Sequence, residues 1–122
     1  MAYLYILRCT DGSLYTGITS DIRRRLCQHM RIRPGGARYT RAHPVCDLAG
    51  LWLTEDLSLA AKLEYAVKRL RRQHKLLLLA EPQRLGRPPF GDAGGALCRP
   101  LPLLPYRPFF PDTSGQSTDT SS

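Results

Sequence analysis

The sequence lacks the features that mark membrane-spanning and secreted proteins. It has no apolar run of 18 residues, the length that a membrane-spanning helix needs. Its first ten residues are too short and too polar at their end for a secretory signal. None of the four cysteines lies in a C-x-x-C pair. We therefore expect a cytoplasmic protein with reduced thiols.

The sequence is also short of acidic residues, and this imbalance indicates a polyanionic partner. It holds 18 Lys and Arg against 10 Asp and Glu in 122 residues, a net charge of +8. The whole excess lies in residues 1–85, because residues 86–122 carry three charges of each sign. A positive field concentrates polyanions, of which nucleic acid is the commonest. A basic surface without a partner is the alternative.

Hydrophobic patterning predicts one α+β domain over residues 1–85, with a small, mainly antiparallel sheet. The expected elements, in chain order, are strands at 3–9 and 14–19, a helix after Ser20 and Asp21, a strand at 48–54 and a helix capped by Ser58. The prediction is thus β-β-α-β-α. Residues 76–80 either extend the last helix or start another.

Residues 86–122 differ in character and are expected to form a disordered C-terminal tail. They contain seven prolines and five glycines and end in TSGQSTDTSS. Such a composition buries too little apolar surface to offset the entropy lost on ordering. The stretch 101–110, LPLLPYRPFF, is more apolar than a linker needs, and its interpretation as a docking motif stays open.

Two tyrosines on the predicted hairpin are the first candidate site residues. A two-residue loop at Asp11 and Gly12 would place Tyr5 and Tyr15 on opposite faces of the sheet. A three-residue loop at 10–12 would place both on one face, roughly 7–8 Å apart. Ordinary half-buried strand tyrosines are the alternative interpretation.

The predicted helix after Asp21 contributes an arginine and a histidine. Arg25 and His29 flank its apolar stripe, and the planar guanidinium of Arg25 suits phosphate oxygens. Arg23 and Arg24 point more toward solvent. We expect nucleic acid to contact these two arginines and the loop at 33–44. The loop residues concerned are Arg33, Arg38, Tyr39 and Arg41.

Glu64 on the next predicted helix is a candidate metal ligand, with Lys68 one turn later. A hard divalent cation prefers oxygen ligands and often uses few protein carboxylates. The alternative is a surface Glu–Lys pair that contributes a few tenths of a kcal/mol.

These spaced residues together resemble the GIY-YIG nuclease superfamily. Tyr3-Leu4-Tyr5, ten residues from Tyr5 to Tyr15, and then Tyr15-Thr16-Gly17 resemble its two signature halves. The positions of Arg25, His29 and Glu64 resemble its arginine, histidine and glutamate. The likeness covers roughly residues 2–80 and is closest to small, single-domain YhbQ-type members. The first segment departs from the signature because it lacks the glycine and the isoleucine.

The resemblance implies a three-stranded antiparallel sheet flanked by helices. It also implies hydrolysis of DNA phosphodiesters with one divalent metal, Mg²⁺ or Mn²⁺, in roles such as DNA repair or the processing of DNA structures. Glu64 would then hold the metal, and Arg25 would stabilise charge in the transition state. Tyr5 or Tyr15 would help to deprotonate water, with His29 and Lys68 as activators.

Three alternatives stay open. The same fold would serve as a catalytically weak or inactive module that binds nucleic acid through its phosphates. Zinc would need Cys27, His29, His43 and Cys46, whose spacing is not a common one. RNA would bind the aromatic and basic loop at 33–44. We expect no second DNA-binding module, so substrate choice would come from the domain's own basic loop or from a protein partner.

Overall fold

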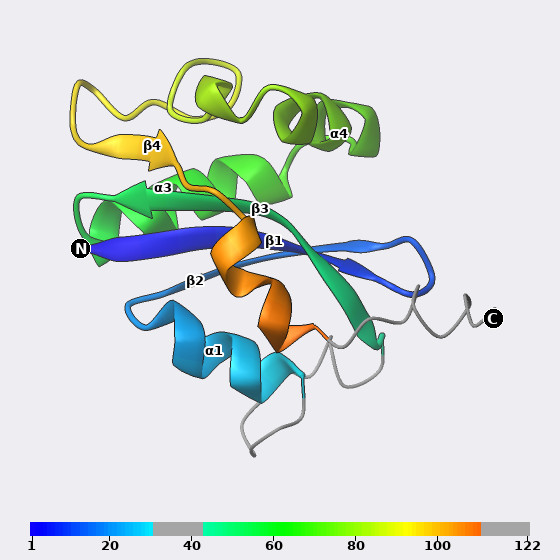
Figure 1. Cartoon of the computed structure of the whole chain (residues 1–122). Helices are drawn as coiled ribbons and strands as arrows, with labels where there is room; N and C mark the ends of the chain where they lie inside the picture. The colour runs from blue at the N-terminus through cyan, green and yellow to red at the C-terminus, as the bar shows by residue number, and fades with distance from the viewer. Residues whose placement is uncertain (31–42, 111–122) are drawn as a thin grey trace, which may run out of the picture.

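A four-stranded antiparallel sheet organises the protein. The computed structural model describes residues 1–30 and 43–110. The strands are β1 (Ala2–Cys9), β2 (Leu14–Thr19), β3 (Val45–Thr54) and β4 (Cys98–Pro100), in the order β2-β1-β3-β4 (Figure 1). The α+β class is confirmed, but the expected three strands are wrong. The fourth strand comes from the segment that its composition marked as disordered.

The β1–β2 hairpin turns through the three-residue loop, one of the two alternatives that the sequence left open. The Cys9 amide donates to the Ser13 carbonyl at 2.9 Å, and Gly12 has a φ of +86°. A left-handed residue at this position is what such a loop requires, and glycine adopts it without a steric penalty. The register pairs Tyr5 with Gly17 and Leu7 with Tyr15. Both tyrosines therefore lie on one face of the sheet.

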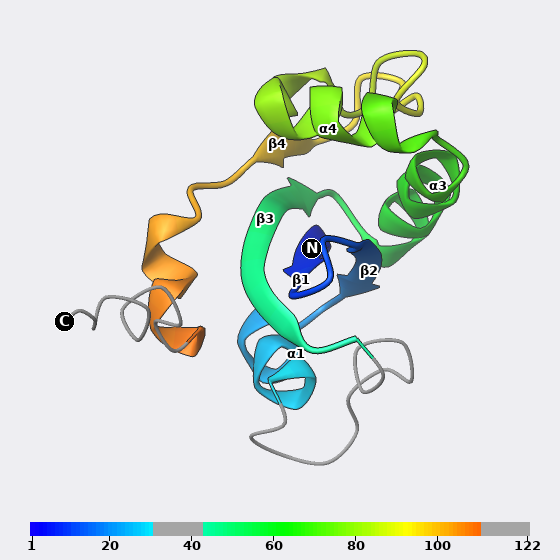
Figure 2. The ribbon, with the colours of Figure 1, turned by 90° about the vertical axis from the view of Figure 1, so that its right-hand side faces the viewer.

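Each face of the sheet is covered by a different set of helices, as Figure 2 shows. One face packs against α3 (Leu57–Lys68) and α4 (Arg72–Ala80), with Leu4, Ile6 and Trp52 in its core. The other packs against α1 (Ile22–His29), with Tyr5 and Leu7 in its core. Alternate residues of β1 thus serve opposite cores, as the period of a strand dictates.

Aspartates cap the N-termini of helices α1 and α3. Asp21 caps α1 by accepting from the Arg24 amide at 3.1 Å, as one of the two expected caps. Asp56, rather than Ser58, caps α3 by accepting from the Leu59 amide at 2.8 Å. Aspartate and serine are both good N-caps, so the sequence alone does not choose between them. The stretch 76–80 ends the separate helix α4.

The expectation of disorder is wrong for residues 86–110. Phe90 is 0% exposed in the core with Leu63 and Trp52. After β4, the 3₁₀ helix η2 (Leu104–Phe109) packs beside α1. Its Tyr106 and the following Phe110 pack against the core on the α1 face of the sheet. Prolines interrupt regular helices here, but the apolar residues between them still pack. The apolar stretch 101–110 therefore packs against its own domain. Residues 111–122 lie outside the described residues.

Within residues 1–30 and 43–110, no helix combines the length and the apolar character that crossing a bilayer demands.

Candidate active site at the edge of strand β2

The two tyrosines meet because Gly17 leaves room between them. The ring centroids of Tyr5 and Tyr15 lie 6.3 Å apart. A Cβ atom built on Gly17 would collide with the Tyr5 hydroxyl, would lie 2.6 Å from Tyr5 Cζ, and would lie 3.1 Å from Tyr15 Cε2. The missing side chain lets the Tyr5 ring extend along the sheet face toward the edge strand β2. Gly17 thus contributes to the site because it has no side chain to fill this space.

Helix α1 delivers an arginine and a histidine to the Tyr5 hydroxyl. The Tyr5 oxygen lies 2.7 Å from His29 Nε2 and accepts from Arg25 Nε at 3.3 Å. The guanidinium only donates, and the Tyr5 oxygen can also donate or accept toward His29, so the tautomer of the imidazole sets the direction of the second hydrogen bond. The result is an ordered relay from Arg25 through Tyr5 to His29.

Burial keeps this relay neutral at its tyrosine and histidine. Burial raises the pKa of the Tyr5 phenol above its ordinary value, although the hydrogen bond from Arg25 opposes the shift. Burial, and then the positive charge of Arg25, lower the pKa of His29 to about 4. His29 is only 2% exposed. Near neutral pH, the Tyr5–His29 pair thus holds one proton between two uncharged groups.

The depressed pKa of His29 predicts acid sensitivity of the fold. The unfolded histidine titrates near 6.5 and the folded one near 4, so the unfolded chain takes up its proton first as the pH falls. The contribution of His29 to the free energy of unfolding is therefore fully present above pH 6.5. It declines by roughly 3 kcal/mol as the pH falls toward 4. Urea unfolding across this range should show the decline in the wild type and a flatter profile in His29→Gln. Identical profiles for the wild type and His29→Gln would contradict this prediction. His74→Gln is the control variant and should keep the decline of the wild type.

Glu64 reaches the same edge from α3, which packs across β2. Its carboxylate pairs with Lys68 at 3.2 Å, and its side chain is 21% exposed. The Lys68 ammonium lies 5.9 Å from the centroid of the Tyr15 ring. The negative charge of Glu64 also acts on the Tyr5 phenol. Contacts thus link all six predicted catalytic residues: Tyr5, Tyr15, Arg25, His29, Glu64 and Lys68.

The donor set at this edge fits a magnesium or manganese ion. Glu64 offers a partly exposed carboxylate, and Mg²⁺ is often bound by one or two carboxylates, with water and substrate phosphate filling its other positions. A zinc site would need more ligands. In the part of the chain that the structure describes, no three His, Cys, Asp or Glu side chains gather for a metal. The His29 Nε2 atom is instead hydrogen-bonded to the Tyr5 hydroxyl, and His43 Nδ1 lies 2.7 Å from Asp11 Oδ2.

The residues predicted to contact nucleic acid have different surroundings. The Arg23 guanidinium lies 5.5 Å from the centroid of the Tyr106 ring and 5.8 Å from that of Phe109. Arg24 lines an open hollow of about 320 Å³ beside the site. The loop residues Arg33, Arg38, Tyr39 and Arg41 lie outside the described residues.

Sequence reasoning missed Gln28 as a site residue. Its amide oxygen accepts from Arg25 Nη1 at 2.8 Å, which fixes the guanidinium while Nε contacts Tyr5. Gln28 also lines the hollow, together with Asp21, Arg24 and Arg25. Its position three residues after Arg25 was the available signal, since residues at i and i+3 are neighbours on a helix.

Comparison with known proteins identifies the family of this chain. The family described as the GIY-YIG catalytic domain matches residues 1–76. A UPF0213 protein of Fusobacterium nucleatum is 36% identical over 80 residues, which is 66% of this chain and 78% of that protein. One of Xanthomonas axonopodis is 44% identical over 82 residues, or 66% and 78% of the two chains.

A solution NMR structure of a UPF0213 protein from Bacillus halodurans is also similar in sequence. It is 33% identical, covers 77% of this chain and 95% of its own, and has a TM-score of 0.44. The matched family spans both tyrosine segments, Arg25, His29 and Glu64. The chain therefore belongs to the GIY-YIG catalytic domain family, with small UPF0213 proteins among its relatives.

Proposed function

We propose that this protein is a metal-dependent endonuclease that hydrolyses DNA phosphodiester bonds. The observation that carries the proposal is the convergence of Arg25, the Tyr5–His29 pair and the Glu64 carboxylate at one edge of the sheet. The net charge of +8 supports a polyanionic substrate. Membership of a catalytic-domain family supports an enzyme.

Glu64 is the residue proposed to hold Mg²⁺ or Mn²⁺. Such an ion, when bound, neutralises negative charge that develops on the phosphate and on the leaving oxygen. Lys68 holds one carboxylate oxygen at 3.2 Å and so fixes the direction of the side chain. The 21% exposure of Glu64 leaves it accessible to a substrate that approaches from solvent.

Arg25 is proposed to bind the scissile phosphate. Its Nε and Nη1 groups are oriented by Tyr5 and Gln28, so the guanidinium is positioned before the substrate arrives. It also lines the hollow that Arg24 borders. A phosphate seated there would meet two guanidinium groups, whose donors match its oxygens. This preorganised charge would stabilise the transition state more than it stabilises the ground state.

Tyr15 is the better candidate for accepting the proton of the attacking water. Tyr5 is 0% exposed, so its hydroxyl is shielded from an attacking water. Tyr15 is only partly buried, and the Lys68 ammonium lies 5.9 Å from its ring centroid. Tyr15 can take that proton only as a phenolate, and the positive charge of Lys68 would stabilise the phenolate before the transfer turns it into the neutral phenol. Tyr5 and His29 then act by positioning Arg25.

A cytoplasmic role in DNA repair, or in the processing of branched DNA, belongs to the same proposal. The described residues form one small domain around a single sheet. A protein partner that supplies substrate specificity is therefore part of the proposal as well. The closest competitor is a module of the same fold that binds nucleic acid and cuts nothing.

The test is cleavage of labelled nucleic acids with magnesium, with manganese and with a chelator. The panel should hold single strands, duplex, flaps and branched junctions, together with an RNA strand of matched sequence. We expect cutting of DNA that the chelator abolishes. Salt-sensitive binding without cutting would overturn the enzyme and support the binding module. Cutting of RNA alone would overturn the DNA assignment.

A further inference from the structure

Tyr65 is the one exposed aromatic side chain in the described part of the chain. It lies on α3 directly after Glu64 and is 66% exposed. The other described aromatic residues are buried or half-buried. Leaving an aromatic ring in water forgoes the free energy of burying it, so a second surface that covers this ring would be favoured.

Arg69 holds the Tyr65 ring in one place. Its guanidinium carbon lies 5.2 Å from the ring centroid, and its Nη1 donates to the Tyr65 hydroxyl at 3.1 Å. The pair spans one turn of α3 and runs beside the Glu64–Lys68 pair. One side of the ring is therefore occupied by Arg69, while most of the residue stays in solvent.

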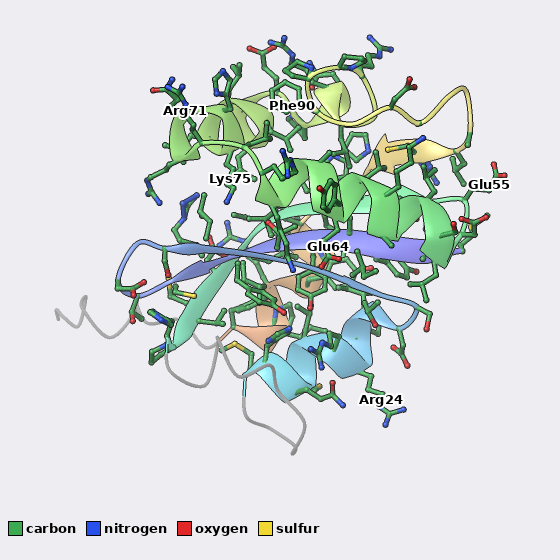
Figure 3. The ribbon with its side chains drawn as sticks, turned by 180° about the vertical axis from the view of Figure 1, so that it is seen from behind. Arg24, Glu55, Glu64, Arg71, Lys75 and Phe90 are labelled. Atoms are coloured by element: carbon green, nitrogen blue, oxygen red, sulfur yellow. The ribbon has the colours of Figure 1, made fainter. Side chains whose placement is uncertain are left out.

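The surroundings of this pair are strongly basic. Residues 62–75 contain six Lys and Arg residues and a single acidic residue, Glu64. Figure 3 shows Arg71 and Lys75 beyond one end of α3, with Glu64 along the helix and Glu55 at its other end. Arg72 donates to the Gly12 carbonyl at 2.9 Å. Positive charge is thus concentrated at and beyond the end of α3 that follows Tyr65.

We propose that Tyr65 and Arg69 form a stacking platform for an unpaired nucleotide of single-stranded DNA that flanks the active site. The inference rests on the proposed function and adds a substrate class to it. An aromatic ring stacks on any base, and neighbouring cations contact the backbone phosphates. Bases inside a duplex are already stacked on each other, so the ring selects strands whose bases are free.

The experiment measures DNA binding by fluorescence anisotropy in chelator, where no metal-dependent cutting occurs. The probes are a short labelled thymidine oligonucleotide and a duplex of equal length. Tyr65→Leu keeps an apolar helix-forming residue but removes the ring, and should weaken single-strand binding about tenfold. Duplex binding, which depends on phosphate contacts, should change less than about twofold.

Two further variants separate stacking from the hydrogen bond and from charge. Tyr65→Phe keeps the ring and loses only the hydroxyl that meets Arg69, so single-strand affinity should stay within about twofold. Arg69→Gln should lower the slope of log affinity against log salt by about 0.7. Arg87→Gln removes an equal charge from an exposed position after α4 and should leave the affinity unchanged.

Unchanged single-strand binding in Tyr65→Leu would overturn the platform, as would an equal loss for single strand and duplex. An equal loss in Tyr65→Phe and Tyr65→Leu would overturn stacking in favour of the hydroxyl. None of these results bears on whether Glu64 supports cutting. A protein that stacks single strands through Tyr65 but never cuts would refute the nuclease and keep the platform.

Discussion

Replacing Glu64 with glutamine is expected to lower the rate of DNA cutting by about a thousandfold or more. Glutamine keeps the size of the side chain but removes the negative charge, so the site loses its proposed metal ligand. DNA binding measured in chelator should be retained, because the change adds no negative charge near Arg25. The measurement is the single-turnover cleavage rate at saturating manganese.

Glu55→Gln provides the matched control at the other end of α3 (Figure 3). The Glu55 carboxylate accepts from the Leu97 amide at 3.2 Å, a bond that a glutamine oxygen also forms. This variant should cut as fast as the wild type. Cutting by Glu64→Gln at the rate of Glu55→Gln would show that the chemistry does not depend on this carboxylate.

Replacing Phe90 with alanine should destabilise the protein by about 3–5 kcal/mol. The ring is 0% exposed and lies in one core cluster with Leu63, Val67 and Trp52, so its removal leaves a cavity in that core. Equilibrium unfolding in urea gives the free energy directly. The loss should appear as a lower midpoint in a single transition, because this segment shares the core of the domain.

The control for this prediction is Leu104→Ala on η2. Leu104 is 70% exposed, so its loss should change stability by less than about 0.5 kcal/mol. If Phe90→Ala unfolded at the same urea concentration as the wild type, residues 86–110 would not be part of the folded core.

The hairpin was the best-predicted element, although the sequence left its register open. Thr10 to Ser13 marked a turn, but two- and three-residue loops were both compatible with Asp11-Gly12. The structure selects the three-residue loop, which places Tyr5 and Tyr15 on one face. Packing of both rings against α1, a contact distant in sequence, favours this register. Local turn chemistry alone does not contain that information.

Helical spacing predicted which side chains of α1 point inward, but not how they are bonded. Arg25 and His29 flank the apolar stripe as the period requires. The relay through the Tyr5 hydroxyl depends on the angle between α1 and the sheet, which the sequence does not specify. Arg23 shows the same limit, because its place over Tyr106 depends on a segment that was expected to be disordered.

The C-terminal segment was mispredicted because composition was weighed above pattern. Proline and glycine content argues against regular helices and central strands. It does not prevent a three-residue edge strand such as β4, or burial of single residues such as Phe90. The apolar stretch at 101–110 was the available signal, and the Leu101 amide donates to the Leu51 carbonyl at 2.9 Å. This stretch, whose interpretation as a docking motif was left open, packs on the sheet and helix α1 of the same chain.

One comparison tests the central claim most directly: cutting of a labelled branched DNA by the wild type in manganese, by the wild type in chelator, and by Glu64→Gln in manganese. The account predicts products in the first reaction and none in the other two within the same time. Equal cutting in all three, or no cutting of any DNA by the wild type in either metal, would contradict it.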